Sequence, residues 1–160
     1  MPERTLILFR HAKSDQTSTG ADIDRPLNPR GRRQAQEAGQ WMAENIDGID
    51  LAVVSPAIRA QTTWDLASAE LDQQPQARVD DRAYSASVAD LLGVVRDLPD
   101  DANTVVLVGH NPGMEELASL LTSTSVPMPT SAIAVLESAT EWSSAGESWA
   151  TLRAEGRPPA

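Results

Sequence analysis

The chain has 160 residues, of which 41% are apolar and none is cysteine, and its formal net charge is −10 at pH 7. This charge argues against binding to nucleic acid or to an anionic membrane, because both need a basic face, and no apolar run approaches the ~20 residues that cross a membrane. The lack of cysteine excludes disulfides and thiolate metal sites and fits a cytoplasmic protein. If this acidic protein binds an anion, some of its 13 basic residues must lie close together.

The first predicted element is a buried strand that ends in two polar residues. Residues 6–11 form an apolar run closed by Arg10 and His11, a pattern typical of a strand covered on both faces of a parallel sheet. Ligands of such sheets bind beyond the carboxyl ends of the strands. The polar loop that follows, over 12–26, is long for a plain connection, and loops of this kind often belong to a functional site.

The rest of the chain continues to alternate between helices and strands. Asn28 and Pro29 have the residue types of an N-cap and a first helical position, and they predict a helix that ends near Gly48. The later predicted elements are a strand at 51–54, a helix capped by Ser55 with Pro56 as its first residue, a strand at 77–79, a helix from Ser87 to 98, a strand at 105–109, a helix from Asn111 and Pro112 to 121, and strands at 132–136 and 148–152. This order indicates an α/β layer fold in one domain over 1–152, with a flexible tail over 153–160.

Three segments at predicted strand ends carry side chains that suit phosphate chemistry. The neutral imidazole of His11 can attack phosphorus, and Arg10 beside it can bind phosphoryl oxygens through paired hydrogen bonds. Arg59 lies one turn into a helix that follows a strand, so it can point back over the same sheet edge. His110 ends another strand, before a helix whose first amides can face an anion. Each residue alone has an ordinary structural explanation, but their convergence on one edge predicts an anion site.

These segments resemble, in the same order, the motifs of the histidine phosphatase superfamily, the phosphoglycerate mutase-like enzymes. The likeness is strongest to its SixA-like branch of phosphohistidine phosphatases, over the segments 8–15, 24–31, 55–62 and 108–113. The resemblance implies a three-layer α/β/α sandwich with a mostly parallel sheet, and a reaction without a metal or other cofactor. It assigns His11 as the nucleophile and Arg10, Arg59 and His110 as the phosphate pocket. We expect His11 to be unprotonated and His110 to be an imidazolium.

The proton donor for the leaving group is open at this stage. Asp15, Asp24, Asp80 and Asp81 are candidates, and the chain can also have none. An alkoxide leaving group gains typically ~10²- to 10⁴-fold from general acid catalysis, whereas imidazole leaves more easily. A weak or missing acid therefore favours a phosphohistidine substrate over a sugar phosphate.

The leading hypothesis is a metal-independent phosphatase that acts on phosphohistidine in proteins through a covalent intermediate on His11. One alternative is a phosphatase for small metabolites or nucleotides with the same pocket. An alternative of another class is a noncatalytic phosphate-binding regulatory module. A zinc site is disfavoured because zinc takes three or four protein ligands and the sequence shows no matching cluster. Lys13 and Arg25 either extend the positive edge of the site or are solvated loop residues, and the oligomeric state is not predicted.

Overall fold

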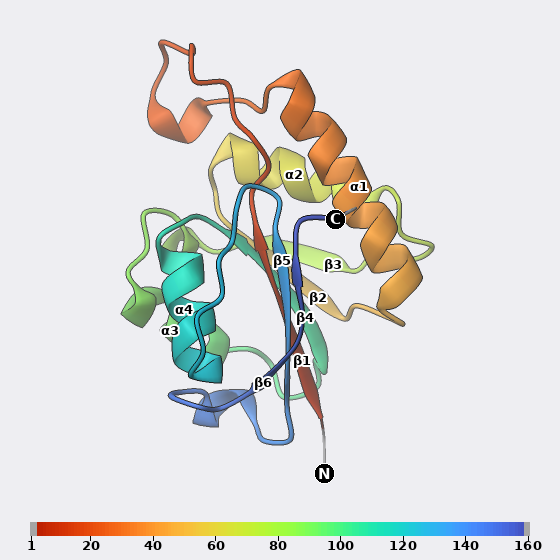
Figure 1. Cartoon of the computed structure of the whole chain (residues 1–160), viewed down its shortest axis with the longest axis vertical. Coiled ribbons are helices and arrows are strands. Elements are labelled where there is room, and N and C mark those ends of the chain that lie inside the picture. The colour runs from red at the N-terminus through yellow and green to blue at the C-terminus, as the bar shows by residue number, and fades with distance from the viewer. Residues whose placement is uncertain (1–2, 159–160) are drawn as a thin grey trace.

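A six-stranded sheet lies between two layers of helices in the computed structural model, which describes residues 3–158 (Figure 1). Across the sheet the strands are β3 (Gln76–Val79), β2 (Leu51–Val54), β4 (Thr104–Gly109), β1 (Arg4–Arg10), β5 (Ile133–Ser138) and β6 (Thr151–Gly156). The first four are parallel to one another, and β5 and β6 are each antiparallel to the preceding strand in this order. The predicted three-layer α/β/α sandwich with a mostly parallel sheet is confirmed.

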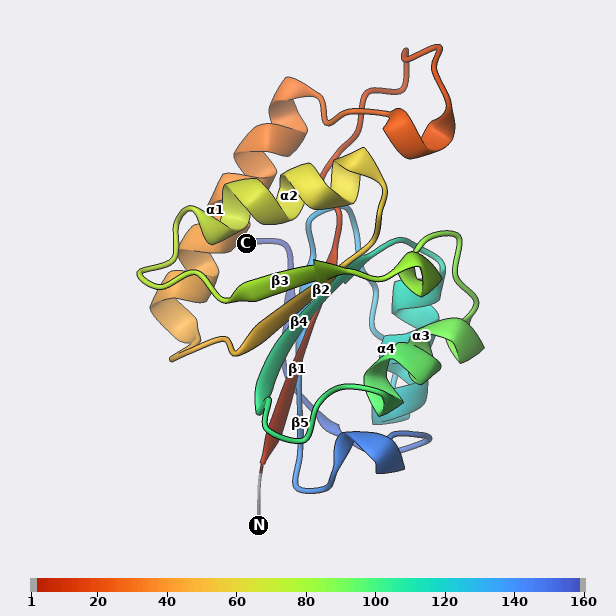
Figure 2. The same ribbon diagram turned by 180° about the vertical axis from the view of Figure 1, so that it is seen from behind.

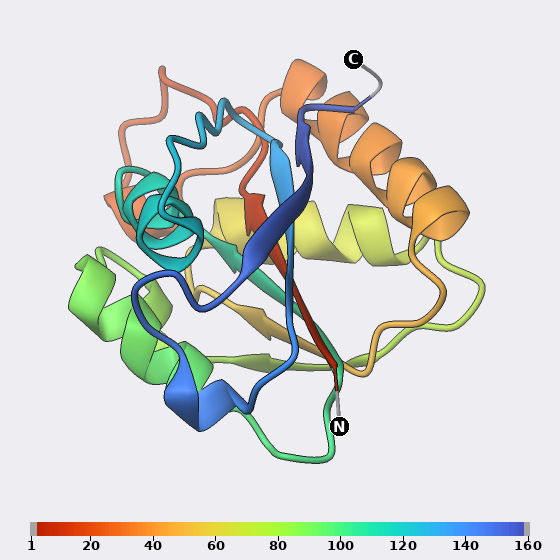
Figure 3. The same cartoon turned by 60° about the horizontal axis from the view of Figure 1, so that its bottom comes forward.

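Strand β1 is buried because its apolar side chains alternate between the two helical layers. Leu6 and Leu8 pack in a cluster with α3 (Val88–Arg96) and α4 (Gly113–Thr122). Ile7 and Phe9 pack on the other face, in a cluster with α1 (Pro29–Asn45) and α2 (Ile58–Ser68). Figure 3 shows the two pairs of helices on opposite sides of the sheet. A continuous apolar run thus produced the doubly covered strand expected of it.

Helix α1 begins where the sequence predicts. The Asn28 side chain accepts a hydrogen bond from the backbone N–H of Gly31 at 2.8 Å, and Pro29 is the first helical residue. The helix ends at Asn45, somewhat before the expected stop at Gly48. Within residues 3–158, no helix is long and apolar enough to cross a membrane.

Helix α2 begins later than predicted. Ser55 and Pro56 were expected to be its N-cap and first residue, but the helix starts at Ile58 and this prediction is wrong. The Ser55 hydroxyl instead lies 2.7 Å from Nε2 of His110, a residue that follows another strand. The hydroxyl also accepts from the backbone N–H of Ala57 at 3.2 Å, so Ser55 makes a local and a tertiary hydrogen bond although it does not begin the helix.

The end of the chain is ordered further than predicted. The strand expected at 148–152 lies at Thr151–Gly156, so the tail expected from 153 is β-strand for its first four residues. Side chains in β6 alternate between exposed and half-buried, which gives little apolar signal in the sequence. The strand forms because the edge of β5 offers it hydrogen-bonding partners.

The register of the parallel strands brings the site residues to one level. Arg10 at the end of β1 lies opposite Gly109 at the end of β4, and Val54 at the end of β2 lies opposite Val108. The residues that follow these strands therefore emerge together at the carboxyl edge of the sheet. In Figure 2 the loops after β1, β2 and β4 all leave the sheet at this end.

Candidate active site

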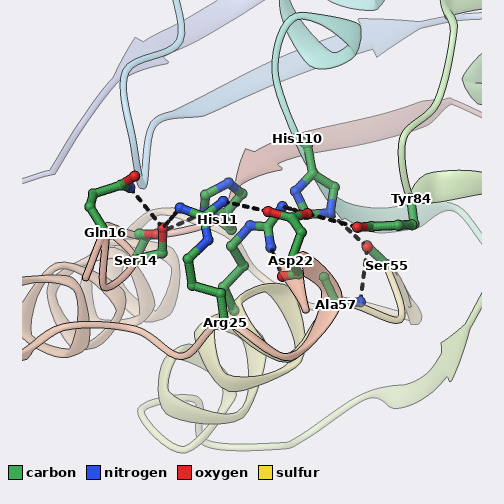
Figure 4. Close-up of polar contacts among 11 residues, drawn as sticks. His11, Ser14, Gln16, Asp22, Arg25, Ser55, Ala57, Tyr84 and His110 are labelled. Atoms are coloured by element: carbon green, nitrogen blue, oxygen red, sulfur yellow. Dashed lines mark hydrogen bonds and ion pairs between the residues drawn. The ribbon is translucent and has the colours of Figure 1, made fainter. Parts of the chain in front are cut away.

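The structure brings together all four residues that the sequence assigned to the site. Arg10 ends β1, His11 follows it, His110 follows β4, and Arg59 lies in the first turn of α2. The ring centroids of His11 and His110 are 4.9 Å apart. Figure 4 shows both side chains in the site. Both guanidinium groups are near enough to lower the pKa of each imidazole. The edge of the sheet therefore holds two imidazoles and two positive charges in one cluster.

His11 is held with one ring nitrogen available for attack. Its Nδ1 lies 2.7 Å from the carbonyl oxygen of Ala12, and because a carbonyl can only accept, Nδ1 carries the ring proton. The lone pair is therefore on Nε2. Burial lowers the pKa of His11 to about 3, with help from His110, Arg59 and Arg10 and against the hydrogen bond to Ala12. As predicted, His11 is an unprotonated imidazole at neutral pH.

Among the protein's own groups His110 is neutral, and the imidazolium expected beside a phosphoryl group stays a prediction. Burial, followed by the charge of Arg59, lowers its pKa to about 4, although Asp22 opposes the shift. A protonated ring would be a third positive group beside Arg10 and Arg59, and the largely buried site does not favour it. His110 can therefore donate a hydrogen bond from one nitrogen only, and the choice of nitrogen matters.

Ser55 favours the tautomer of His110 with its proton on Nδ1. The fully buried Ser55 hydroxyl accepts from the backbone N–H of Ala57 at 3.2 Å, which leaves its own proton for Nε2 of His110. Nδ1 has no partner among residues 3–158 in either tautomer, but the opposite tautomer would also leave the proton of the buried Ser55 hydroxyl without an acceptor there. Unpaired buried polar groups cost about 1–3 kcal/mol each. In the favoured tautomer, the Nδ1 proton is free for a ligand oxygen.

The two arginines are anchored at one end and have unused donors. Arg10 donates from Nη1 to the carbonyl oxygen of Met128 at 3.0 Å. Arg59, which is 6% exposed, donates to the backbone oxygen and the carboxylate of Asp22 at 2.7 Å and 3.1 Å. The buried Nε atoms of both arginines have no partner in the described part of the chain. Anchored guanidinium groups with spare N–H donors suit a phosphoryl group.

Asp22 is the site residue that sequence reasoning missed. Its carboxylate accepts hydrogen bonds from the Tyr84 hydroxyl at 2.7 Å, from Arg25 at 2.8 Å and from Arg59 at 3.1 Å (Figure 4). These bonds, that of Tyr84 first, hold the pKa of Asp22 well below its usual range. The group is therefore an ionised acceptor and not a proton donor at neutral pH. The length of the loop over 12–26 was the one signal that pointed to this region.

The carboxylates considered from the sequence lie elsewhere. Asp15 accepts hydrogen bonds from Thr17, and Asp80 is paired with Arg82 at 2.9 Å. In the part of the chain that the structure covers, no hydrogen bond or ion pair joins Asp15, Asp24, Asp80 or Asp81 to the four pocket residues. The same residues 3–158 contain no group of three or more His, Cys, Asp or Glu that could hold a metal ion. Arg25 reaches the site through Asp22, so it is more than a solvated loop residue.

Comparison with known proteins agrees with this geometry. Residues 6–84 match the model of the histidine phosphatase superfamily, branch 1. An uncharacterised protein of Mycobacterium tuberculosis is 37% identical over 145 residues, which cover 84% of this chain and 89% of the relative.

Solved structures show the same relationship. SixA from Nakamurella multipartitia is 31% identical, with a TM-score of 0.87 and full coverage of both chains. The protein histidine phosphatase SixA in complex with tungstate shares the fold at 23% identity, with a TM-score of 0.82 over 96% of this chain and 97% of that one. The chain therefore belongs to the histidine phosphatase superfamily and is a phosphatase.

Proposed function

We propose that this phosphatase removes the phosphoryl group from phosphohistidine in proteins, through a covalent intermediate on His11. The observation that carries the proposal is the state of His11, a neutral imidazole whose Nδ1 is held by a carbonyl and whose Nε2 is free, beside Arg10 and Arg59. The likeness to SixA, of which one solved example is named a protein histidine phosphatase, supports the choice of substrate.

In the first step, Nε2 of His11 forms a bond to phosphorus while the bond between phosphorus and the substrate imidazole breaks. Arg10 and Arg59 bind the phosphoryl oxygens and neutralise their charge, and His110 donates from Nδ1. Asp22, now paired with Arg59, gives up part of this contact to the incoming phosphoryl group. The departing imidazole takes a proton from water.

In the second step, water attacks the phosphorus and the bond to Nε2 of His11 breaks. The oxygen of water stays on phosphorus, and inorganic phosphate leaves. The proton that water loses balances the one that the departing imidazole took up. The hydrogen bond from His11 to Ala12 persists through both steps, so the ring returns to its starting tautomer.

The absence of a protonated carboxyl group among the contacts described above favours phosphohistidine over an alkyl phosphate. Asp22 is the acidic residue that contacts Arg59, and its three hydrogen bonds keep it ionised. An alkoxide would have to leave without a proton donor, which slows the reaction strongly. An imidazole is a better leaving group and depends less on such a donor. The proposed partner is thus a phosphorylated protein, and the cytoplasmic location expected from the sequence stays a prediction.

The test compares a phosphohistidine peptide, an unactivated alkyl phosphate and a nucleotide as substrates of the wild type and of His11→Ala. The peptide should exceed the alkyl phosphate in kcat/KM by on the order of 10²-fold, and His11→Ala should lose both turnover and acid-labile phosphoryl labelling. Asp81→Asn, which changes an exposed carboxylate outside the pocket contacts, is the control and should keep both. Equal turnover of peptide and alkyl phosphate would refute the substrate class, and labelling of His11→Ala would refute the nucleophile.

A further inference from the structure

Three arginine side chains line a surface groove next to the active site. The groove has a volume of about 270 Å³ and lies between the first half of α1 and the segment that follows β6. Figure 1 shows the described end of the chain beside α1. We call it the arginine groove, and its lining residues are Arg30, Arg33, Gln34, Glu37, Arg157 and Pro158.

The arginine groove has a surplus of positive charge that the protein itself does not neutralise. Glu37 is its one acidic lining residue, and no ion pair in residues 3–158 involves Arg30, Arg33 or Arg157. Arg30 lies in the first turn of α1, where the helix dipole disfavours cations and where no acidic residue compensates. In a chain of net charge −10 this concentration of cations suits an anionic ligand.

Gln34 adds an amide donor from a largely buried side chain to the arginine groove. Its side chain is among the buried polar groups, with 6% of the residue exposed. The amide oxygen accepts a hydrogen bond from the backbone N–H of Lys13 at 3.1 Å, which fixes the orientation of the amide. The NH₂ group then has no acceptor among the described residues, so it is available to an oxygen of a ligand in the groove.

The arginine groove is connected to the active site on two sides. Gln34 holds Lys13, which is two residues beyond His11. Arg157 donates a hydrogen bond to the carbonyl oxygen of Thr130 at 3.4 Å. Ser131, which follows Thr130, donates from its backbone N–H to the backbone carbonyl oxygen of His11 at 3.0 Å. The groove and His11 are therefore connected through Lys13 on one side and through Thr130 and Ser131 on the other.

We propose that the arginine groove binds the carboxylates of an acidic segment that flanks the phosphohistidine in the protein substrate. The inference rests on the proposed function and adds a sequence preference to it. Guanidinium groups bind carboxylates through paired hydrogen bonds, and the groove offers three of them with one amide donor. The remaining surface of an acidic protein repels such a segment, so the groove also orients it.

The test uses two phosphohistidine peptides that differ only in their flanks, one with Asp and Glu and one with Asn and Gln. The double variant Arg30→Gln/Arg33→Gln should lower kcat/KM for the acidic peptide about tenfold through KM, and the effect should weaken at high salt. The neutral peptide and an activated aryl phosphate should be unaffected. The single variants Arg33→Gln and Arg32→Gln are the matched pair, because each removes one charge from the same helix and Arg32 does not line the groove.

A direct binding measurement separates this proposal from the proposed function. Fluorescence anisotropy of a labelled unphosphorylated acidic peptide should show weaker binding to Arg33→Gln than to Arg32→Gln, whether or not the protein hydrolyses phosphohistidine. Equal loss in both variants, or no preference of the wild type for the acidic peptide, would overturn the groove as a binding site. Failure to hydrolyse either phosphohistidine peptide would overturn the proposed function instead.

Discussion

At the scale of single residues, the chemistry depends on which nitrogen of each imidazole carries a proton. In His11 the proton is on Nδ1, because the backbone carbonyl of Ala12 beside this nitrogen can only accept a hydrogen bond. For His110 the hydroxyl of Ser55 decides, because its oxygen already accepts from Ala57 and its proton is left for the ring. Both partners are invisible in the local sequence pattern, where Ser55 has the residue type of a helix cap.

Replacing Ser55 with alanine should change the tautomer of His110 and slow the reaction. Without the hydroxyl, Nε2 has no donor facing it and the proton moves toward that nitrogen, so kcat should fall about tenfold or more. The ¹⁵N chemical shifts of His110 report the tautomer, and Ser55→Thr should restore both readings. If Ser55→Ala lowers kcat while the ¹⁵N shifts stay unchanged, the hydroxyl has a structural role only.

At the scale of elements, the site depends on the close contact between α1 and α2, since α2 carries Arg59. The two helices meet where Gly39 of α1 faces the backbone of Ala67 in α2. A side chain at position 39 would overlap the Ala67 carbonyl group, which is backbone and cannot turn away. The absence of a Cβ at this position therefore sets how close the helices lie.

Gly39→Ala should destabilise the protein by about 1–3 kcal/mol, because the helices must separate to accept the methyl group. Urea unfolding of the wild type and the variant gives this difference in the free energy of unfolding. Gly48→Ala is the control, since a Cβ there would have no atom within 4 Å, and it should change stability by less than about 0.5 kcal/mol. Equal stability of the two variants would contradict this account of the helix contact.

At the scale of the whole molecule, the site makes stability depend on pH. The pKa of His11 is about 3 and that of His110 about 4 in the folded chain, both below the ordinary value of 6.5. Between these values the unfolded chain binds protons that the folded chain does not, so stability rises with pH in this window. Asp22 also has a lowered pKa, but its contribution is lost only at lower pH, below the ordinary range of a carboxyl group.

The free energy of unfolding should therefore fall as the pH is lowered from 7 to 4.5. Urea unfolding at several pH values measures this slope for the wild type and for His11→Asn/His110→Asn. The variant should have the shallower slope, because its remaining carboxyl groups titrate as before while the two buried imidazoles are gone. Identical slopes would show that the histidines do not titrate differently in the folded and unfolded chains.

Local patterns in the sequence were enough to predict the α/β layers and the meeting of Arg10, His11, Arg59 and His110 at one sheet edge. Buried strands are continuous apolar runs, and the polar residues that follow them must meet at the carboxyl edge of a parallel sheet, which located Arg10, His11 and His110. Arg59 followed from its position one turn into a helix after a strand. These inferences are local, and the family resemblance strengthened them.

The hydrogen-bond network around these residues depends on contacts between distant parts of the chain. Ser55 and His110 are 55 positions apart, and Asp22 and Tyr84 are 62 positions apart, so no local pattern announces either contact. Burial next to two arginines made His110 neutral, and pairing with β5 extended the last strand to Gly156. Desolvation and long-range hydrogen bonds exist only in the folded chain, which is why protonation states and positioning contacts could not be predicted from the sequence.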